Sequence, residues 1–448
     1  MKKLILLVGT GLFAISSFGQ TKDSASFSFS LQQAIDFALQ NQKDVKNAMI
    51  DEQIAQKKVN EITGLGLPQI NSSFDLREFI EIPTSLIPAE IFGGPPGSFA
   101  AVKFGTKYNA TAGLDASQLL FSGDYFLGLK ASKVFVEISS KSTQRTKIEA
   151  SATVAKAYFT VLVNEERIKL IDATIERVKQ TLANTKSLLD NGFVEKIDFD
   201  RLTVTYNNLL VEQEKYQRLL KLGTYLLKYQ MGMDINANLS LTDKLEDVKF
   251  DVSGSSSAQK FDYEKRVEFG LFQSQFKLAK LDLKRQRLSY LPTAFAYGSL
   301  SGAAQRNEFD IFDTDKKWFP TSVVGAKVTM PIFTGLQRHA RNQQAKLSLL
   351  KAENNIDFIK NSIDLEVASA STILQNASSS LENQKKNITI AEDVVRVSKL
   401  KYEQGVGSNI EMITAETSLK EAQTNYFNAL FDALVAKIDF DKANGNLK

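Results

Sequence analysis

The residue types that most often carry enzyme chemistry are scarce in this chain of 448 residues. It contains no cysteine and a single histidine, His339. A thiol nucleophile, a disulfide, a zinc cluster and a histidine-based triad are therefore excluded. His339 is expected to be a solvated or pore-facing polar residue, because no second histidine or cysteine could share a metal ion with it. We expect no catalytic, cofactor or metal site.

Acidic and aromatic side chains gather in one segment near residue 310. Asp310, Asp313 and Asp315 lie there, but the Asp-x-Asp-x-Asp-Gly spacing of a calcium loop is absent, so a solvated loop is favoured over a calcium site. The neighbouring aromatic residues are Phe309, Phe312, Trp318 and Phe319. These residues either anchor the loop, which is the interpretation we favour, or form part of an aromatic girdle at a membrane interface.

The N-terminal segment, residues 1–20, has the features of a secretory signal peptide. A basic start at Lys2 and Lys3 precedes an apolar run from Leu4 to Ile15 and a small-residue stretch. The apolar run is shorter than the roughly 20 residues that span a membrane, so cleavage near Gln20 is favoured over an uncleaved anchor. Without cysteine, the mature chain is not expected to be a lipoprotein.

The charge of the chain is nearly balanced. Lys plus Arg number 55 against 51 Asp plus Glu, and removal of Lys2 and Lys3 leaves 53 (55 − 2) against 51. Electrostatic capture of nucleic acid is therefore not expected.

An internal repeat organises the rest of the chain. Phe121-Ser122-Gly123 recurs as Phe333-Thr334-Gly335, an offset of 212 (333 − 121), and Asn191-Gly192 matches Gln404-Gly405 at 213 (405 − 192). This predicts two repeats, residues 21–232 and 262–448, joined by an equatorial linker at 233–261. The first repeat also carries a longer Pro- and Gly-rich loop, residues 82–97.

Each repeat contains the patterns of three helical segments. Residues 125–189 and 336–403 lack proline and place apolar residues at steps of three and four, which predicts coiled-coil helices of roughly 100 Å. A glycine turn follows each of them, then a returning helix at 195–230 or 409–444. The opening helices, 31–63 and 262–290, have the length needed to cover the remainder of each long helix.

Four segments alternate apolar and polar residues with a period of two. They are residues 69–79, 107–117, 293–302 and 323–330. Such a pattern is typical of strands in an outer-membrane hairpin. For any one strand taken alone, a half-buried strand of a soluble sheet explains the pattern equally well. Four strands cannot close a barrel, and an open edge is not tolerated in lipid, so several chains must contribute to one barrel. The fold class expected is mainly α with a membrane β-barrel.

The ordered set of motifs resembles the TolC family of outer-membrane efflux ducts. The most specific segment is Lys401-Tyr402-Glu403-Gln404-Gly405-Val406-Gly407-Ser408-Asn409-Ile410-Glu411 with the Ala415, Leu419 and Ala422 run after it. Residues 30–41 also resemble the first helix of the family, and Phe333-Thr334-Gly335 resembles its strand-to-helix junction. The resemblance implies a homotrimer with a twelve-stranded barrel in the outer membrane of a Gram-negative bacterium, above an α-helical periplasmic tunnel.

The same resemblance implies two kinds of site. Contact with a periplasmic adaptor, also called a membrane fusion protein, is expected at the tips of the helical hairpins. The residues are Gly192, Phe193, Val194, Gly405, Val406, Gly407 and Ile410. A gate is expected where the returning helices begin, at Asp198 and Glu411, with Thr414 where the family often has a second acid. Both carboxylates could instead merely complement a helix dipole.

Two function classes remain open. The first is a passive exit duct of a tripartite efflux or type I secretion system, which receives substrate from an inner-membrane transporter through the adaptor. The second is a periplasmic coiled-coil adaptor or structural envelope protein without a pore. An enzyme is a distant third, because no set of nucleophile, base and orienting residue is recognisable. The sequence does not identify the cargo.

Overall fold

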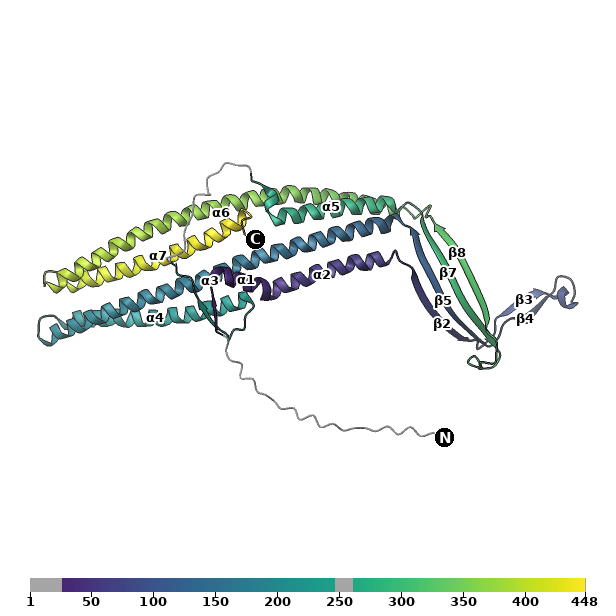
Figure 1. Cartoon of the computed structure of the whole chain (residues 1–448), viewed down its shortest axis with the longest axis horizontal. Coiled ribbons are helices and arrows are strands. Elements are labelled where there is room, and N and C mark those ends of the chain that lie inside the picture. The colour runs from purple at the N-terminus through teal and green to yellow at the C-terminus, as the bar shows by residue number, and fades with distance from the viewer. Residues whose placement is uncertain (1–25, 246–260, 448) are drawn as a thin grey trace, which may run out of the picture. The chain divides into compact units, whose positions relative to one another are not determined.

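The fold is mostly helical, with one four-stranded sheet (Figure 1). The computed structural model describes residues 26–245 and 261–447. The expected signal peptide and residues 246–260 of the expected linker lie outside the described residues. No helix among the described residues is long and apolar enough to cross a membrane.

Two helices are far longer than the others. α3 (Gly123–Asp190) has 68 residues and α6 (Gln337–Glu403) has 67, so each extends over roughly 100 Å at about 1.5 Å per residue. The returning helices are α4 (Lys196–Met231) and α7 (Asn409–Ala443). The long helices lack interior proline, and their apolar positions recur at helical spacing.

Each long helix packs on its returning helix through a small apolar seam. Between α3 and α4 the buried residues are Ile175, Val178 and Leu209. Between α6 and α7 they are Val395, Ala415 and Leu419. We refer to α3 with α4, and to α6 with α7, as the first and second helical hairpins.

The opening segment of the chain differs from the single helix expected over residues 31–63. It forms α1 (Leu31–Asn41) and α2 (Lys43–Gly64), separated by Gln42 in an extended conformation. The C-terminal end of α4 comes very close to this break, since a Cβ on Gly232 would lie 2.6 Å from the Asn41 carbonyl oxygen. Gly232 also has a φ of 69°, so only glycine fits both the turn and the contact.

The opening helix of the second half also begins later than the expected residue 262. A short 3₁₀ turn, Tyr263–Lys265, precedes α5 (Val267–Leu288). Arg266 between them is extended, and its buried guanidinium donates to the Ala443 carbonyl at 2.8 Å and to Glu366 at 2.7 Å. Because Arg266 binds these two groups, the chain is held out of the helix at this residue.

The strands expected from the alternating pattern form one antiparallel sheet in the order β2-β5-β7-β8. The strands are β2 (Gln69–Glu78), β5 (Tyr108–Phe121), β7 (Thr293–Arg306) and β8 (Phe319–Thr329). β5 and β7 have 14 residues each, and β7 ends four residues beyond the expected 302. β2 and β8 are the edge strands, so one backbone side of each has no partner within this sheet.

The register of this sheet puts most apolar residues of the four strands on one face. Phe74 of β2 lies opposite Ala112 of β5, and Ala112 lies opposite Gly302 of β7. Leu300 of β7 lies opposite Ser322 of β8, which is on the same face as Val324. Side chains alternate between faces along a strand. One face therefore carries Ile70, Phe74, Leu76, Ala110, Ala112, Leu114, Ala116, Ala294, Ala296, Leu300, Val324, Ala326 and Val328. The other face is mostly polar, but it also carries Phe295 and Tyr297 of β7 and Phe319 and Val323 of β8.

Two smaller sheets complete the strands. The loop expected at residues 82–97 contains β3 (Thr84–Pro88) and a 3₁₀ turn, and β3 forms a hairpin with β4 (Phe99–Lys103), which follows that loop. β1 (Ser26–Phe29) pairs in parallel with β6 (Asn238–Leu241), inside the segment expected to be a linker.

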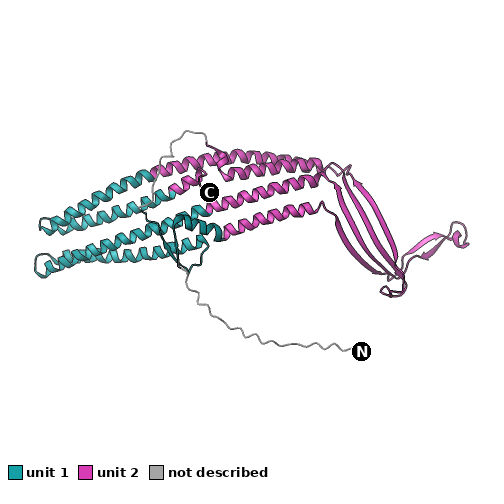
Figure 2. Cartoon of the chain, in the orientation of Figure 1, with its two compact units in different colours: residues 1–42, 150–252, 377–435 teal, residues 43–149, 253–376, 436–448 magenta. Residues whose placement is uncertain are grey.

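The chain divides into two compact units (Figure 2). Unit 1 comprises residues 1–42, 150–252 and 377–435, and unit 2 comprises residues 43–149, 253–376 and 436–448. Each unit draws on both proposed repeats, because each long helix contributes residues to both units. The helical tips belong to unit 1 and the four-stranded sheet to unit 2.

Candidate gate and docking tips

The two hairpin tips have the same backbone construction. Gly192 and Gly405 have φ values of 77° and 73°, in the left-handed region that favours glycine. The amide of Phe193 donates to the Leu188 carbonyl at 2.9 Å, and that of Val406 to the Lys401 carbonyl at 3.0 Å. These bonds satisfy carbonyls at the helix end. Each tip is thus a rigid turn specified locally by its own sequence.

The side chains at these turns are largely exposed in the isolated chain. Phe193 and Val406 are 77% and 79% exposed, Ile410 is exposed, and Val194 is half-buried. Gly407 has a different role, because a Cβ there would lie 2.8 Å from the Lys401 Cβ. The tips therefore present apolar groups on a fixed backbone, as an apolar partner surface requires.

Asp198 connects the two hairpins. It lies in the first turn of α4, and the Asn409 amide group at the start of α7 donates to its carboxylate and to its backbone carbonyl, both at 3.0 Å. Arg201 lies 3.8 Å from the same carboxylate. Asn409 is buried, and its Oδ1 has no hydrogen-bond partner among the described residues.

Glu411 and Thr414 make no such connection between hairpins. Glu411 lies in the first turn of α7 and is exposed, and its backbone amide is capped by the Ser408 hydroxyl at 3.2 Å. The Thr414 hydroxyl donates to the Ile410 carbonyl of its own helix at 2.7 Å. Within one chain, Asp198 is thus bonded across the hairpins, whereas Glu411 faces solvent.

Polar residues absent from the sequence interpretation also join the hairpins. Arg177 of α3 makes a two-pronged ion pair with Glu416 of α7, at 3.1 and 3.2 Å. Lys420 of α7 pairs with Glu212 of α4. Arg177 and Glu416 are 239 positions apart. No sequence spacing reveals that pair, because it depends on which faces of the two hairpins meet.

A third link is centred on Arg167 of α3. Its guanidinium lies 4.8 Å from the Tyr216 ring centre and 5.6 Å from that of Phe427, and it donates to Asn428 at 2.9 Å. A cavity of about 20 Å³, enough for roughly one water molecule, lies beside it. The contact between hairpins is therefore largely polar, unlike the apolar seam within each hairpin.

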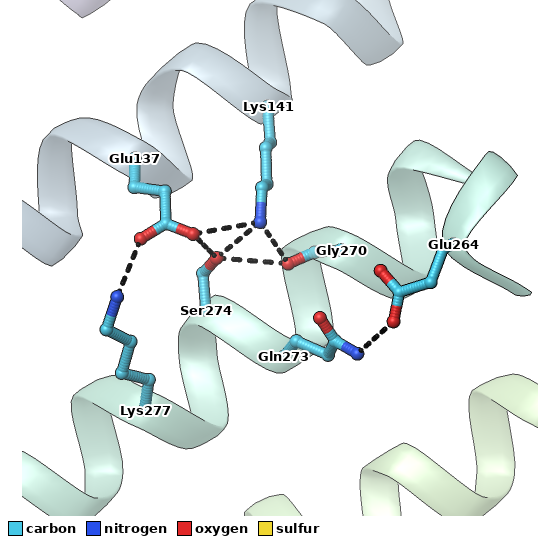
Figure 3. A network of polar contacts seen from close by, with 7 residues as sticks. All are labelled: Glu137, Lys141, Glu264, Gly270, Gln273, Ser274 and Lys277. Atoms are coloured by element: carbon cyan, nitrogen blue, oxygen red, sulfur yellow. Dashed lines mark hydrogen bonds and ion pairs between the residues drawn. The ribbon is translucent and has the colours of Figure 1, made fainter.

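A different polar network joins α3 to α5 within unit 2 (Figure 3). Lys141 donates to Glu137 at 3.0 Å, to Ser274 at 2.8 Å and to the Gly270 carbonyl at 2.9 Å, and Lys277 reaches Glu137 at 3.2 Å. Hydrogen bonds from Lys141 and then Ser274 lower the pKa of Glu137 to about 2.

The β7–β8 loop combines anchored and exposed residues. Ile311 is buried with Ala110 and Ala304, and Trp318 packs against this cluster. Asp310 forms ion pairs with Arg306 and Lys316, so its carboxylate is already paired with basic side chains. Phe309, Phe312 and Phe319 are exposed. His339 is also exposed, in the first turn of α6.

Known outer-membrane efflux proteins are similar to this chain. The model of the outer membrane efflux protein family matches residues 271–446. The chain is 21% identical to "Outer membrane protein TolC" of Escherichia coli over 458 aligned positions, which cover 100% of this chain and 87% of that protein. The chain is thus similar to the TolC-like outer-membrane efflux proteins, and the family model matches part of its second half.

A further relative and two solved structures are also similar to this chain. "Probable efflux pump outer membrane protein TtgC" of Pseudomonas putida is 21% identical, covering 76% of this chain and 69% of that protein. The fold matches the Campylobacter jejuni CmeC outer membrane channel with a TM-score of 0.72 and 16% identity, covering 99% and 94% of the two chains. The fold also matches the Neisseria gonorrhoeae MtrE outer membrane channel with a TM-score of 0.71 and 19% identity. The match covers 93% of this chain and 88% of that chain.

Proposed function

We propose that this TolC-like protein is the outer-membrane exit duct of a tripartite efflux or type I secretion system. It would conduct substrates passively from an inner-membrane transporter and a periplasmic adaptor to the exterior. The relatives are named as efflux pump outer membrane proteins and the matched folds as channels, which favours the duct over a periplasmic adaptor without a pore. We assign the chain no catalytic role.

The observation that carries this proposal is that one face of the four-stranded sheet is predominantly apolar and the other mostly polar. A strand that faces lipid on one side and a water-filled lumen on the other alternates apolar and polar residues. Val324 on the apolar face is 91% exposed in the isolated chain. Large apolar groups so exposed to water are unfavourable, whereas contact with lipid removes them from water.

The open edges of the sheet support a homotrimer. β2 runs away from α2, whereas β8 runs toward α6, so β8 of one chain and β2 of the next have the antiparallel sense that this sheet uses throughout. Pairing of these edges would satisfy backbone groups that lipid cannot. Three chains of four strands would give twelve strands, above the roughly eight needed to enclose a lumen.

We place the gate at the tip end of the hairpins. Three copies of Glu411 around a narrow axis would repel one another and attract cations. The Asp198–Asn409 bond and the Arg177–Glu416 pair would hold the two hairpins together in the resting state. Thr414 adds no charge, so the second half would supply one acidic ring.

We assign the adaptor contact to the exposed tip side chains. Phe193, Val406 and Ile410 offer apolar surface suited to the end of a partner's helical hairpin. The substitution Val406→Asp should abolish crosslinking to the cognate adaptor without loss of the trimer. Val406 suits this test better than Gly405, because a side chain at Gly405 would strain the turn itself.

The oligomeric state in mild detergent tests the duct directly. Light scattering of the purified mature chain should give a monodisperse species with three times the mass of the chain. A monodisperse monomer would falsify the proposal, because four strands cannot enclose a pore. Fractionation gives a second test, since an adaptor without a barrel should leave with the soluble or inner-membrane fraction.

A further inference from the structure

A cavity lined by arginine lies at the junction of the sheet with the helices. Its volume is about 440 Å³, and its lining comes from the end of α5, the start of β7 and the starts of α3 and α6. Arg285, Arg338 and Arg341 contribute guanidinium groups, and Asp124 contributes a carboxylate. The charged lining thus carries a formal +2 (3 − 1), which suits an anion.

The three arginines are held to different extents. Arg285 pairs with Asp124 at 3.4 Å and with Asp282 at 2.9 Å. Arg338 donates to the Ser289 carbonyl and lies over the Tyr290 ring. Arg341 has no hydrogen bond or ion pair to the described residues. Two guanidinium groups are therefore fixed in place, and a third is available to a ligand.

The uncharged lining also suits a phosphate group. The Ser122 hydroxyl lines the cavity, whereas the hydroxyls of Ser289 and Thr293 already donate to the carbonyls of Gln286 and Thr329. α3 and α6 both begin at this cavity, and the positive end of a helix dipole favours negative charge. Arginine forks match the oxygen geometry of a phosphate.

A second, independent observation concerns exposed apolar side chains around the four strand–helix junctions. Large apolar residues within a few positions of these junctions stand exposed in the isolated chain, and Ile332 reaches 96%. They are Leu65, Leu67, Phe121, Phe126, Tyr290, Leu291, Met330, Ile332, Phe333 and Leu336. An apolar belt beside a cationic cavity suits a ligand with acyl chains as well as an anionic group.

We propose that this cavity, which we call the junction site, binds the phosphate group of a phospholipid. The assignment rests on the proposed function, since a barrel in the outer membrane would put the junctions at the level of the inner-leaflet headgroups. Arg341 and Arg338 bind the phosphodiester oxygens, and the acyl chains lie along the apolar belt. Bound lipid fixes the depth of the barrel in the membrane.

Native mass spectrometry of the full mature chain released from detergent tests the junction site. The probes are phosphatidylglycerol, a diacylglycerol with the same acyl chains, and inorganic phosphate as a competitor. Wild type should retain one phosphatidylglycerol per chain and no diacylglycerol. Arg341→Gln should weaken phosphatidylglycerol binding roughly ten-fold, as expected for loss of charge-assisted hydrogen bonds, and Arg341→Lys should restore part of the affinity.

The matched control is Arg396→Gln, which removes an exposed arginine from the same helix outside the site. It should bind lipid like wild type. The junction site is overturned if Arg341→Gln also binds like wild type, if diacylglycerol binds as well as phosphatidylglycerol, or if equimolar phosphate displaces the lipid. The same spectra give the mass of the assembly. A trimer without bound lipid refutes the junction site alone. A monomer refutes the proposed duct, and the number of lipids bound per chain is measured in both cases.

Discussion

Polar contacts hold helices together in two regions of this protein, and the two sets differ in how many partners each charged group has. In unit 2, Arg266 is 4% exposed and reaches Glu268, Glu366 and the Ala443 carbonyl, while Lys141 joins three groups at once. In unit 1, the hairpins are joined by separate links such as Asp198–Asn409 and Arg177–Glu416. A network in which one charged group has several partners resists the loss of any single bond, whereas separate links can open one by one.

This difference matches the proposed roles of the two regions. The helices that carry the barrel must keep one arrangement, so a charge buried among several partners is useful there. Under the proposed function the tips part to pass substrate, and a polar interface can exchange its bonds for water at low cost. An apolar seam within each hairpin keeps the hairpin intact when the two hairpins separate.

The largest effect is expected from Arg266→Ala. It leaves Glu268 and the Ala443 carbonyl without their buried partner, and loss of one member of a buried ion pair costs about 3–5 kcal/mol. Thermal unfolding followed by circular dichroism should show a strongly lowered transition. Arg396→Ala, at an exposed site of α6, should change stability by less than about 0.5 kcal/mol. Equal transitions in the two variants would show that the Arg266 contacts do not stabilise the fold.

A smaller effect is expected from Glu137→Gln, and it should depend on pH. The folded pKa is lowered from 4.5 to about 2, so the carboxylate stabilises the fold above pH 4.5, and this stabilisation is lost as the pH falls toward 2. Because the Glu137 side chain is 39% exposed, solvent screening reduces this stabilisation of the fold to about 1 kcal/mol. Melting curves of wild type and variant should differ at pH 7 and converge near pH 2. A difference that is the same at both pH values would contradict this account.

A local effect is expected from Asp198→Ala. Removal of the carboxylate breaks one bond to Asn409, so the first turn of α7 should open more often while global stability changes by about 1 kcal/mol or less. Hydrogen exchange of residues 409–412 should accelerate. The control is Asp200→Ala, at an exposed position of the same helix. If the control accelerates exchange as much, the Asp198–Asn409 bond is not a link between the hairpins.

The smallest effect on stability is expected from Glu411→Gln, because the side chain is exposed. Its expected effect is on ion flow: weaker cation selectivity and weaker block by multivalent cations in planar bilayers. If conductance, selectivity and block are all unchanged, Glu411 is a residue of the helix start and nothing more.

The sequence predicted those parts of the fold that depend on local pattern. Long proline-free runs predicted helices where α3 and α6 lie, and the alternation in residues 107–117 predicted a strand where β5 lies. The break at Gln42 was missed because it follows from the approach of Gly232, 190 positions away (232 − 42). The β3–β4 hairpin was missed because proline and glycine in that segment indicated a plain loop.

The candidate site was predictable to a lesser extent. The tip glycines follow from local turn chemistry, so Gly192 and Gly405 were identified from their sequence alone. The roles of Asp198 and Glu411 came from a family resemblance and stay predictions. The Arg177–Glu416 pair and the arginine cavity depend on which helix faces meet, and no sequence spacing encodes that.

The central claim is that this chain forms a trimeric duct whose helical end is closed by polar links between hairpins. Single-channel conductance in planar bilayers tests it most directly, with wild type compared to the double variant Arg177→Gln/Glu416→Gln. The account predicts a small conductance for wild type, and a severalfold larger one for the variant with the trimer unchanged. If the variant conducts like wild type, the Arg177–Glu416 pair does not close the helical end of the duct. Absence of any channel in both proteins would contradict the duct itself.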